Sequence, residues 1–370
     1  MNRFIRSDVT WIILLFLIWR IGLFFTAFLS PLVIPEFGAK FPYYEETLVK
    51  TGLPYFIWSF GNFDGVHYLR IAQDGYAYQY TQVFFPMFPI FIKLVSFLTF
   101  GNFLIAGLLI SNIAFISALI IFYRLIAQIY SKKTAFWSCL FLLSFPTSFY
   151  FGSVYTEGIF FLMIISAFYL SWKNNILLAS AVGCLASATR LVGVFLAVSL
   201  IKDLKFKNLL PLVLVPLGLI VYMVYLKIEF NNPFYFLSAQ SIFGQERSTG
   251  TIVLFPQVVW RYLKILATTS GLPLFNAIFE LFSALFATVL LIVGVKFIKK
   301  EWLMFSFLAV LTPTLTGTFA SMPRYILIAF PIYIVLAHIK SNLIKVFIVI
   351  VFAIILAIST VLFTRGYWVA

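Results

Sequence analysis

The sequence predicts an all-α polytopic integral membrane protein, and three observations lead to this prediction. Hydrophobic residues make up 63% of the 370 residues and charged residues only 10%, whereas soluble domains are about 45–50% apolar and about 25% charged. Apolar runs of about 20 residues, enough to cross a bilayer, recur along the chain. The net charge of +14 is best explained as basic residues that orient membrane spans. A soluble enzyme, a disordered regulator and a disulfide scaffold are excluded, and no nucleic-acid partner is expected.

The apolar runs predict about eleven transmembrane helices within a single domain, residues 1–370. The first run, 9–29, follows Arg3 and Arg6, is too long for a signal-peptide core and lacks a small-residue cleavage site, so we expect an uncleaved span. The other runs are 102–127, 134–150, 154–171, 175–190, 191–202, 207–228, 274–297, 302–319, 324–339 and 343–364. Residues 30–101 and 229–272 are predicted to form two long extramembrane loops.

Residues 84–100 decide the topology of everything that follows. This stretch is apolar but short, contains Lys93 and begins with the proline-broken sequence Phe-Phe-Pro-Met-Phe-Pro. If it lies on the membrane surface, most of the downstream basic loop residues share one side with Arg3 and Arg6, which predicts a cytoplasmic N-terminus. Both long loops are then extracytoplasmic and carry most of the acidic residues. Because orientation does not require acids on that side, we expect the chemistry there.

The first candidate constellation lies in residues 63–76. Asp64 and His67 are three residues apart and share a face if the segment is helical. Their alternative roles are structural, because Asp64 would also suit a helix start and Asp74-Gly75 is a turn signal. A carboxylate beside a histidine otherwise indicates acid–base chemistry.

The second and third constellations lie at predicted span ends. Glu157 follows the sequence Phe-Pro-Thr-Ser-Phe-Tyr-Phe-Gly-Ser-Val-Tyr-Thr, and a carboxylate at a membrane boundary is costly enough to indicate function. Arg190 is the last residue of the run 175–190, and Arg324 is the first residue of the run 324–339. They could simply snorkel to lipid headgroups, but two converging arginines would make a phosphate site. The sequence has no phosphate loop, dinucleotide fingerprint, nucleophile elbow, zinc helix or Asp-x-Asp pair.

Four motifs resemble the PIG-V family, which comprises the second mannosyltransferase of glycosylphosphatidylinositol assembly and its prokaryotic relatives. They are Phe-Asp-Gly-Val-His-Tyr-Leu at 63–69, Phe-Phe-Pro-Met-Phe-Pro at 84–89, the motif ending in Glu157, and Ala-Thr-Arg-Leu-Val-Gly at 188–193. The resemblance resumes at Arg324-Tyr325. Phe63 stands where the family usually has Trp, which changes the aromatic side chain and leaves the acid in place.

The resemblance implies a fold of the GT-C type with its active site on the extracytoplasmic face of the cell membrane. It also implies a polyprenyl-phosphate sugar donor, typically of mannose, a lipid or glycan acceptor, and Asp64 as the catalytic base. Inverting transfer needs such a base and positive charge at the leaving phosphate. The predicted roles are therefore base for Asp64, donor-phosphate binding for Arg190, Arg324 and His67, and sugar or acceptor binding for Asp74, Glu157, Tyr68 and Tyr325.

No cofactor is expected, because arginines alone could stabilise a departing lipid monophosphate. A divalent metal between Asp64 and Asp74 stays open at this point. The alternative function is a transporter or flippase for a lipid-linked sugar. It is less favoured, because the charges lie at span boundaries and the chain shows no two related halves.

Overall fold

The computed structural model describes residues 2–38, 41–240, 247–248 and 251–369, and only the backbone of residues 2–8. Every regular element among these described residues is a helix, which confirms the predicted all-α class. Parts of the two predicted loops (39–40, 241–246 and 249–250) lie outside the described residues, as do the side chains of Arg3 and Arg6.

The chain forms two compact units that interleave along the sequence. The first comprises Met1–Gly75, Phe88–Tyr169 and Leu336–Val369, and the second comprises Tyr76–Met87 and Leu170–Val335. A single domain over 1–370 stays a prediction.

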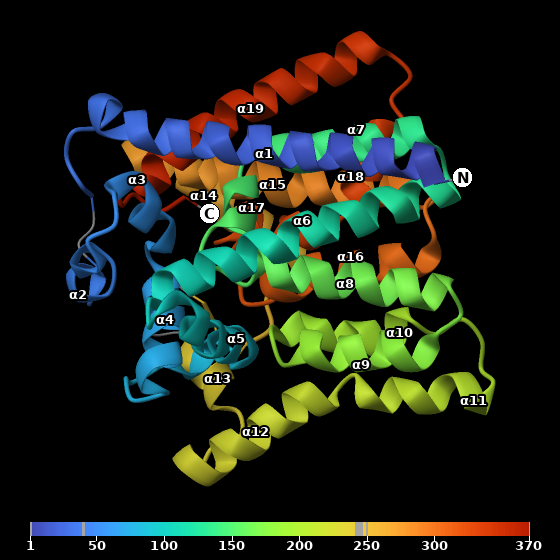
Figure 1. Ribbon diagram of the computed structural model, residues 1–370, viewed down its shortest axis with the longest axis horizontal. Coiled ribbons are helices and arrows are strands. Elements are labelled where there is room, and N and C mark those ends of the chain that lie inside the picture. The colour runs from blue at the N-terminus through green and yellow to red at the C-terminus, as the bar shows by residue number, and fades with distance from the viewer. Residues whose placement is uncertain (1, 39–40, 241–246, 249–250, 370) are drawn as a thin grey trace. The chain divides into compact units, whose positions relative to one another are not determined.

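The first unit is built on long helices with short helices at one end. In Figure 1 α1 and α19 lie side by side, and the short elements α2 to α4 gather near the C-terminal end of α1. Its elements are α1 (Asn2–Val33), α2 (Tyr44–Thr47), η1 (Val49–Thr51), α3 (Tyr55–Trp58), η2 (Ser59–Gly61), α4 (Asp64–Asp74), most of α5 (Met87–Ser96), η4 (Phe97–Thr99), α6 (Phe103–Ile129), α7 (Lys132–Ser144), η5 (Ser148–Gly152), most of α8 (Glu157–Trp172) and α19 (Asn342–Thr364).

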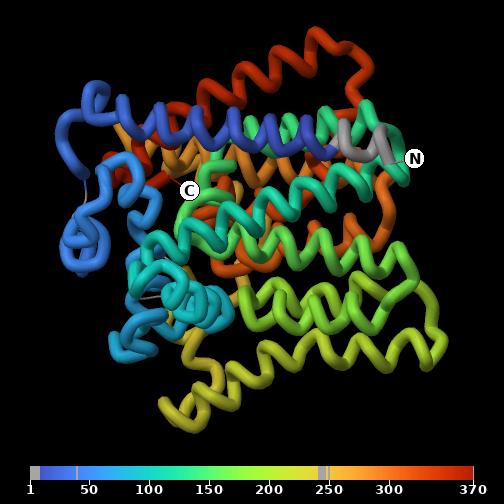
Figure 2. The backbone as a smooth tube through the Cα atoms, viewed as in Figure 1, coloured from blue at the N-terminus to red at the C-terminus, as the bar shows by residue number. Residues whose placement is uncertain are grey.

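The second unit places a long helical stretch beside α9. Figure 2 shows residues 206–230 running as a nearly continuous helical rod along α9, although they comprise α11, η7 and α12. The unit contains η3 (Thr81–Val83), α9 (Ile176–Ser187), η6 (Leu191–Phe195), α10 (Leu196–Ser199), α11 (Phe206–Leu209), η7 (Leu210–Leu214), α12 (Leu217–Phe230), α13 (Tyr235–Ser238), α14 (Phe255–Thr268), α15 (Gly271–Gly294), α16 (Lys300–Thr314), α17 (Met322–Tyr325), η9 (Ile326–Ile328) and most of α18 (Pro331–Ala337).

Several helices begin at a polar side chain that caps the first turn. Asn102, Ser131, Asn175 and Ser341 each accept a hydrogen bond from the backbone amide three residues ahead, at the starts of α6, α7, α9 and α19. Such caps satisfy amide groups that have no partner within the helix. Each of these caps therefore defines the residue at which its helix begins.

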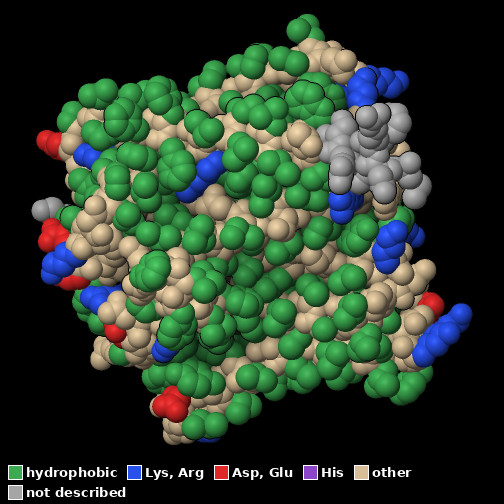
Figure 3. Space-filling view, in the orientation of Figure 1, with side chains coloured by type: hydrophobic (Ala, Val, Ile, Leu, Met, Phe, Trp, Pro, Cys, Tyr) green, Lys and Arg blue, Asp and Glu red, His purple; other side chains and the backbone are tan. Residues whose placement is uncertain are grey.

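Five helical segments among the described residues are long and apolar enough to cross a membrane, judged by length and composition: Val9–Val33, Phe103–Ile129, Phe206–Phe230, Gly271–Gly294 and Asn342–Thr364. Each overlaps a predicted span. Hydrophobic side chains cover much of the surface over α1 and α19 in Figure 3, as expected for helices that face lipid. These segments indicate a multi-pass integral membrane protein.

Other predicted spans are shorter or interrupted. The run 134–150 stops being α-helical after Ser144, because Phe145 precedes Pro146 and adopts an extended ψ of 139°. The run 324–339 is divided into α17, η9 and α18, with the break before Pro331. The stretch 84–100 is helical from Met87 to Thr99, and its position on the membrane surface stays a prediction, as do the number of crossings and the topology.

Candidate active site

Asp64 is the first residue of α4 and follows a strained backbone position. Phe63 has φ 57° and ψ −118°, a conformation that bulky residues rarely adopt and that costs about 1–3 kcal/mol. Its ring is held by Phe41, Phe363 and Trp368, with centroid distances of 4.8, 5.7 and 5.1 Å. This aromatic packing fixes the backbone conformation of Phe63 and therefore the position of Asp64, the candidate base, at the start of α4.

His67 lies one turn after Asp64 and interacts with it. Burial lowers the pKa of the His67 imidazole, and the negative charge of Asp64 opposes this shift in part. The neutral imidazole is therefore favoured near neutral pH, where His67 would act on a phosphate as a hydrogen-bond donor rather than as a cation. Tyr68 is buried, and its ring packs between α4 and the rings of Phe88 and Tyr155.

The first two constellations meet within the first unit. The amide of Val154 donates to the carbonyl of Phe60 at 3.0 Å, and the Tyr155 hydroxyl donates to the carbonyl of Asn62 at 3.0 Å. A Cβ on Gly65 would lie 3.3 Å from the Val154 carbonyl oxygen, so the start of α4 packs closely on this segment. Glu157, two residues later, begins α8 and is only 1% exposed.

Gly158 is expected to tolerate no larger side chain. A Cβ there would lie 2.7 Å from the carbonyl oxygens of both Phe151 and Ser111. Because backbone atoms cannot rotate away, we expect Gly158→Ala to lower the free energy of unfolding by about 1–3 kcal/mol. Thermal unfolding of the purified protein in detergent measures this change.

Gly22→Ala is the matched control, because a Cβ on Gly22 in α1 meets nothing within 4 Å. That variant should be neutral or stabilising by up to about 1 kcal/mol, as expected for alanine in a helix. A Gly158→Ala protein as stable as the Gly22→Ala protein would contradict the predicted clash.

Asp74 lies at the other end of α4, where it is exposed and forms an ion pair with Arg70 at 3.4 Å. It is ten positions after Asp64 in the same helix, about 15 Å along the axis. The two carboxylates are therefore too far apart to bind one metal ion. Among the described residues, no group of three or more His, Cys, Asp or Glu side chains is placed to hold a metal.

The third constellation is assembled within the second unit. Arg190 follows α9 in an extended conformation and leads into η6, and Gly193 comes so close to the end of α9 that a Cβ would lie 2.4 Å from the Ala186 carbonyl oxygen. The guanidinium carbons of Arg190 and Arg324 each lie 5.4 Å from the centroid of the Tyr325 ring. The two arginines that the sequence singles out therefore meet at one tyrosine.

Arg247 is a member of this cluster that the sequence analysis missed. Its Nη2 donates to the Tyr325 hydroxyl at 3.1 Å, and its guanidinium carbon lies 5.9 Å from the ring centroid. Three guanidinium groups therefore meet at the side chain of Tyr325.

Hydrogen bonds hold the chain that leads into α17. The Tyr262 hydroxyl donates to Glu280 Oε2 at 2.5 Å and accepts a bond from the Phe319 amide at 3.1 Å. Arg261 donates to the carbonyl of Gly317 at 3.1 Å, and Gly317 has a φ of 88°, which favours glycine. Residues of α14 and α15 thus brace the segment that positions Arg324.

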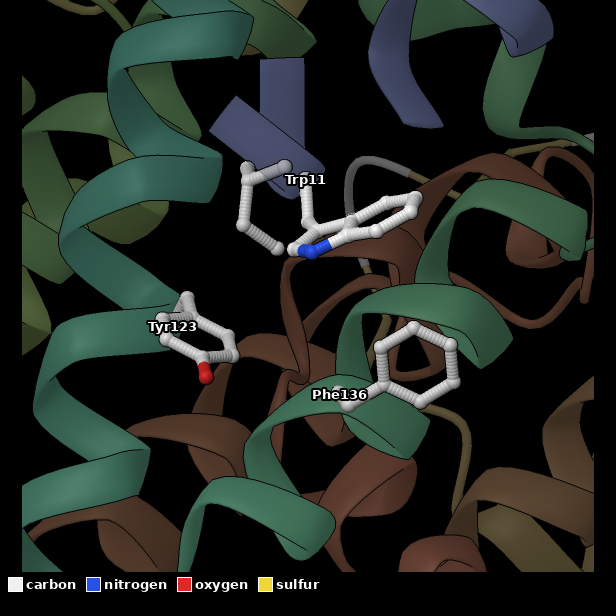
Figure 4. A pocket seen from close by; sticks show the side chains of 4 residues that line it. Trp11, Tyr123 and Phe136 are labelled. Carbon is white, nitrogen blue, oxygen red and sulfur yellow. The ribbon is translucent and has the colours of Figure 1, made fainter. Parts of the chain in front are cut away.

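A separate apolar pocket of about 350 Å³ lies in the first unit between α1, α6 and α7. Figure 4 shows Trp11, Tyr123 and Phe136, which line it together with Ile12. None of the predicted site residues is among its lining residues.

Comparisons with known proteins agree with these motifs. The family described as Mannosyltransferase (PIG-V) matches residues 6–201, just over half of the chain. Proteins named GPI mannosyltransferase 2 from two strains of Cryptococcus neoformans var. neoformans serotype D are each 30% identical over 150 residues, which cover 37% of this chain and 35% of the relative. The matched part thus spans about a third of the length of these curated relatives. No solved structure matches.

Proposed function

Because this chain belongs to the PIG-V family of mannosyltransferases, we propose that it transfers mannose from a polyprenyl-phosphate-linked donor to a lipid or glycan acceptor on the extracytoplasmic face of the membrane. The main support is the placement of Asp64. It stands at the start of α4, beside the segment that leads to Glu157 and within the part of the chain that matches the family.

In the proposed reaction the acceptor hydroxyl attacks the anomeric carbon of the donor. The Asp64 carboxylate takes the proton of that hydroxyl as the new C–O bond forms. The bond between the anomeric carbon and the phosphate oxygen breaks, and its electron pair leaves with the polyprenyl phosphate. Attack opposite the leaving group inverts the configuration at the anomeric carbon.

The leaving phosphate gains one negative charge during this step, and Arg190 and Arg324 are the proposed groups that stabilise it. His67 would donate a hydrogen bond to the phosphate, and Glu157, Asp74, Tyr68 and Tyr325 would bind sugar or acceptor hydroxyls. Guanidinium groups remain protonated at any working pH, so the proposal includes no metal ion and no cofactor.

Mass spectrometry of the reaction product is the direct test. Membranes that contain the protein are incubated with isotope-labelled polyprenyl-phosphate mannose, and we expect one labelled hexose on a lipid or glycan together with free polyprenyl phosphate. The anomeric configuration of the product, measured by NMR, should be opposite to that of the donor.

The same preparation distinguishes the transporter alternative. Reconstituted in liposomes, a flippase would move the lipid-linked sugar between leaflets without forming a glycosidic bond. Translocation without a labelled product would contradict the proposed transfer reaction.

A further inference from the structure

Three arginines from distant parts of the sequence surround the ring of Tyr325 in the second unit. Arg190 follows α9, Arg324 lies in α17, and Arg247 comes from the segment between α13 and α14. Their guanidinium carbons lie 5.4, 5.4 and 5.9 Å from the ring centroid, in that order. The fold therefore concentrates three like charges at one place.

Such a concentration is unfavourable unless negative charge compensates for it. Arg324 is only 8% exposed, so water screens its charge poorly. Glu280 interacts electrostatically with Arg247, but it also accepts the hydrogen bond of Tyr262.

Guanidinium groups present planar pairs of N–H donors that match the oxygens of a phosphate. The hydrogen bond from Arg247 Nη2 to the Tyr325 hydroxyl fixes the orientation of the Arg247 guanidinium group beside the Tyr325 ring. Three guanidinium groups suit the doubly charged phosphate monoester that leaves in the proposed reaction better than the singly charged diester of the donor.

We infer that Arg247 joins Arg190 and Arg324 in a three-arginine site that binds the phosphate monoester of a polyprenyl lipid. The identity of the lipid rests on the proposed function, whereas the binding requires no sugar transfer. Arg247 lies within residues 229–272, the predicted loop in which the sequence shows no motif.

Equilibrium binding to the purified full-length chain tests this inference. The protein is placed in nanodiscs of neutral lipid and titrated with a fluorescent short-chain polyprenyl phosphate. We expect Arg247→Ala to weaken binding about tenfold, the effect of losing one charge-assisted hydrogen bond. The affinity of Arg247→Lys should lie between those of the wild type and Arg247→Ala, because lysine keeps the charge and loses the planar pair of donors. Tyr325→Phe should weaken binding about threefold, because it removes the hydroxyl that orients Arg247.

Lys264→Ala is the matched control. It removes one positive charge from α14, where Lys264 is exposed, and it should leave binding unchanged. Inorganic phosphate should compete with the probe, and polyprenol without phosphate should not. Melting temperatures close to that of the wild type establish that the variants are folded.

Wild-type affinity of a folded Arg247→Ala protein for polyprenyl phosphate would overturn the inference. The inference would also be overturned if Arg247→Ala weakened only the binding of phosphatidylglycerol added to the nanodiscs. The cluster would then be a general site for lipid headgroups. Arg247-dependent binding by a protein that transfers no mannose would uphold the inference while the proposed function failed.

Discussion

Replacement of Asp64 by Asn is expected to lower kcat for mannosyl transfer by about 10²–10⁴-fold, the usual contribution of a general base. Asn has nearly the same shape as Asp, and loss of a carboxylate from the first turn of α4 costs only about 0.3–1 kcal/mol, so α4 should form as in the wild type. The amide cannot accept the acceptor's proton, and the attacking oxygen loses its activation. Initial rates with labelled polyprenyl-phosphate mannose, measured at saturating donor, give this change.

Glu46→Gln provides the matched control for the loss of a carboxylate. Glu46 is exposed in α2, within the same unit, and has no proposed role, so this variant should keep the wild-type rate. Equal melting temperatures of both variants would separate chemistry from folding. A folded Asp64→Asn protein with more than about a tenth of the wild-type kcat would rule out Asp64 as the base.

The membrane-spanning helices could be predicted from the sequence because their signal is local. A run of about 20 apolar residues is recognisable without knowledge of its neighbours, and the predicted end of the last span at 364 coincides with the end of α19. The breaks before Pro146 and Pro331 could not be predicted from hydrophobicity, because apolar composition continues across both prolines. Phe145 and Phe330 precede these prolines, and a proline disfavours the helical conformation of the residue before it.

The residues of the candidate site likewise fall into those that a local motif identifies and those that only the fold brings together. Asp64, Glu157 and Arg190 could be selected because each belongs to a recognisable motif, although their roles stay predictions. Arg247 could not be selected, because its meeting with Tyr325, 78 residues away, depends on long-range packing. The positive φ of Phe63 could not be predicted either, since an aromatic residue gives no local indication of positive φ.

Replacement of Arg324 by Ala is expected to lower kcat for the polyprenyl-phosphate donor by about 10²–10³-fold, as does removal of one donor from other sites that stabilise developing charge. The effect should fall more on kcat than on KM, because the phosphate gains its second charge only as the bond breaks. Arg324→Lys should recover part of the rate, since it restores the charge without the planar donors. Steady-state kinetics on the purified variants measure this division.

A donor without phosphate separates electrostatic catalysis from a structural role of Arg324. Mannosyl fluoride, with the anomeric configuration of the natural donor, leaves as fluoride and places no phosphate near the arginines. Arg324→Ala should therefore lose less than about tenfold with this donor, whereas Asp64→Asn should again lose about 10²–10⁴-fold because the acceptor still needs its base. If Arg324→Ala lost the same factor with both donors, Arg324 would act by holding α17 and its neighbours in place, and the charge would have no part in the departure of the phosphate.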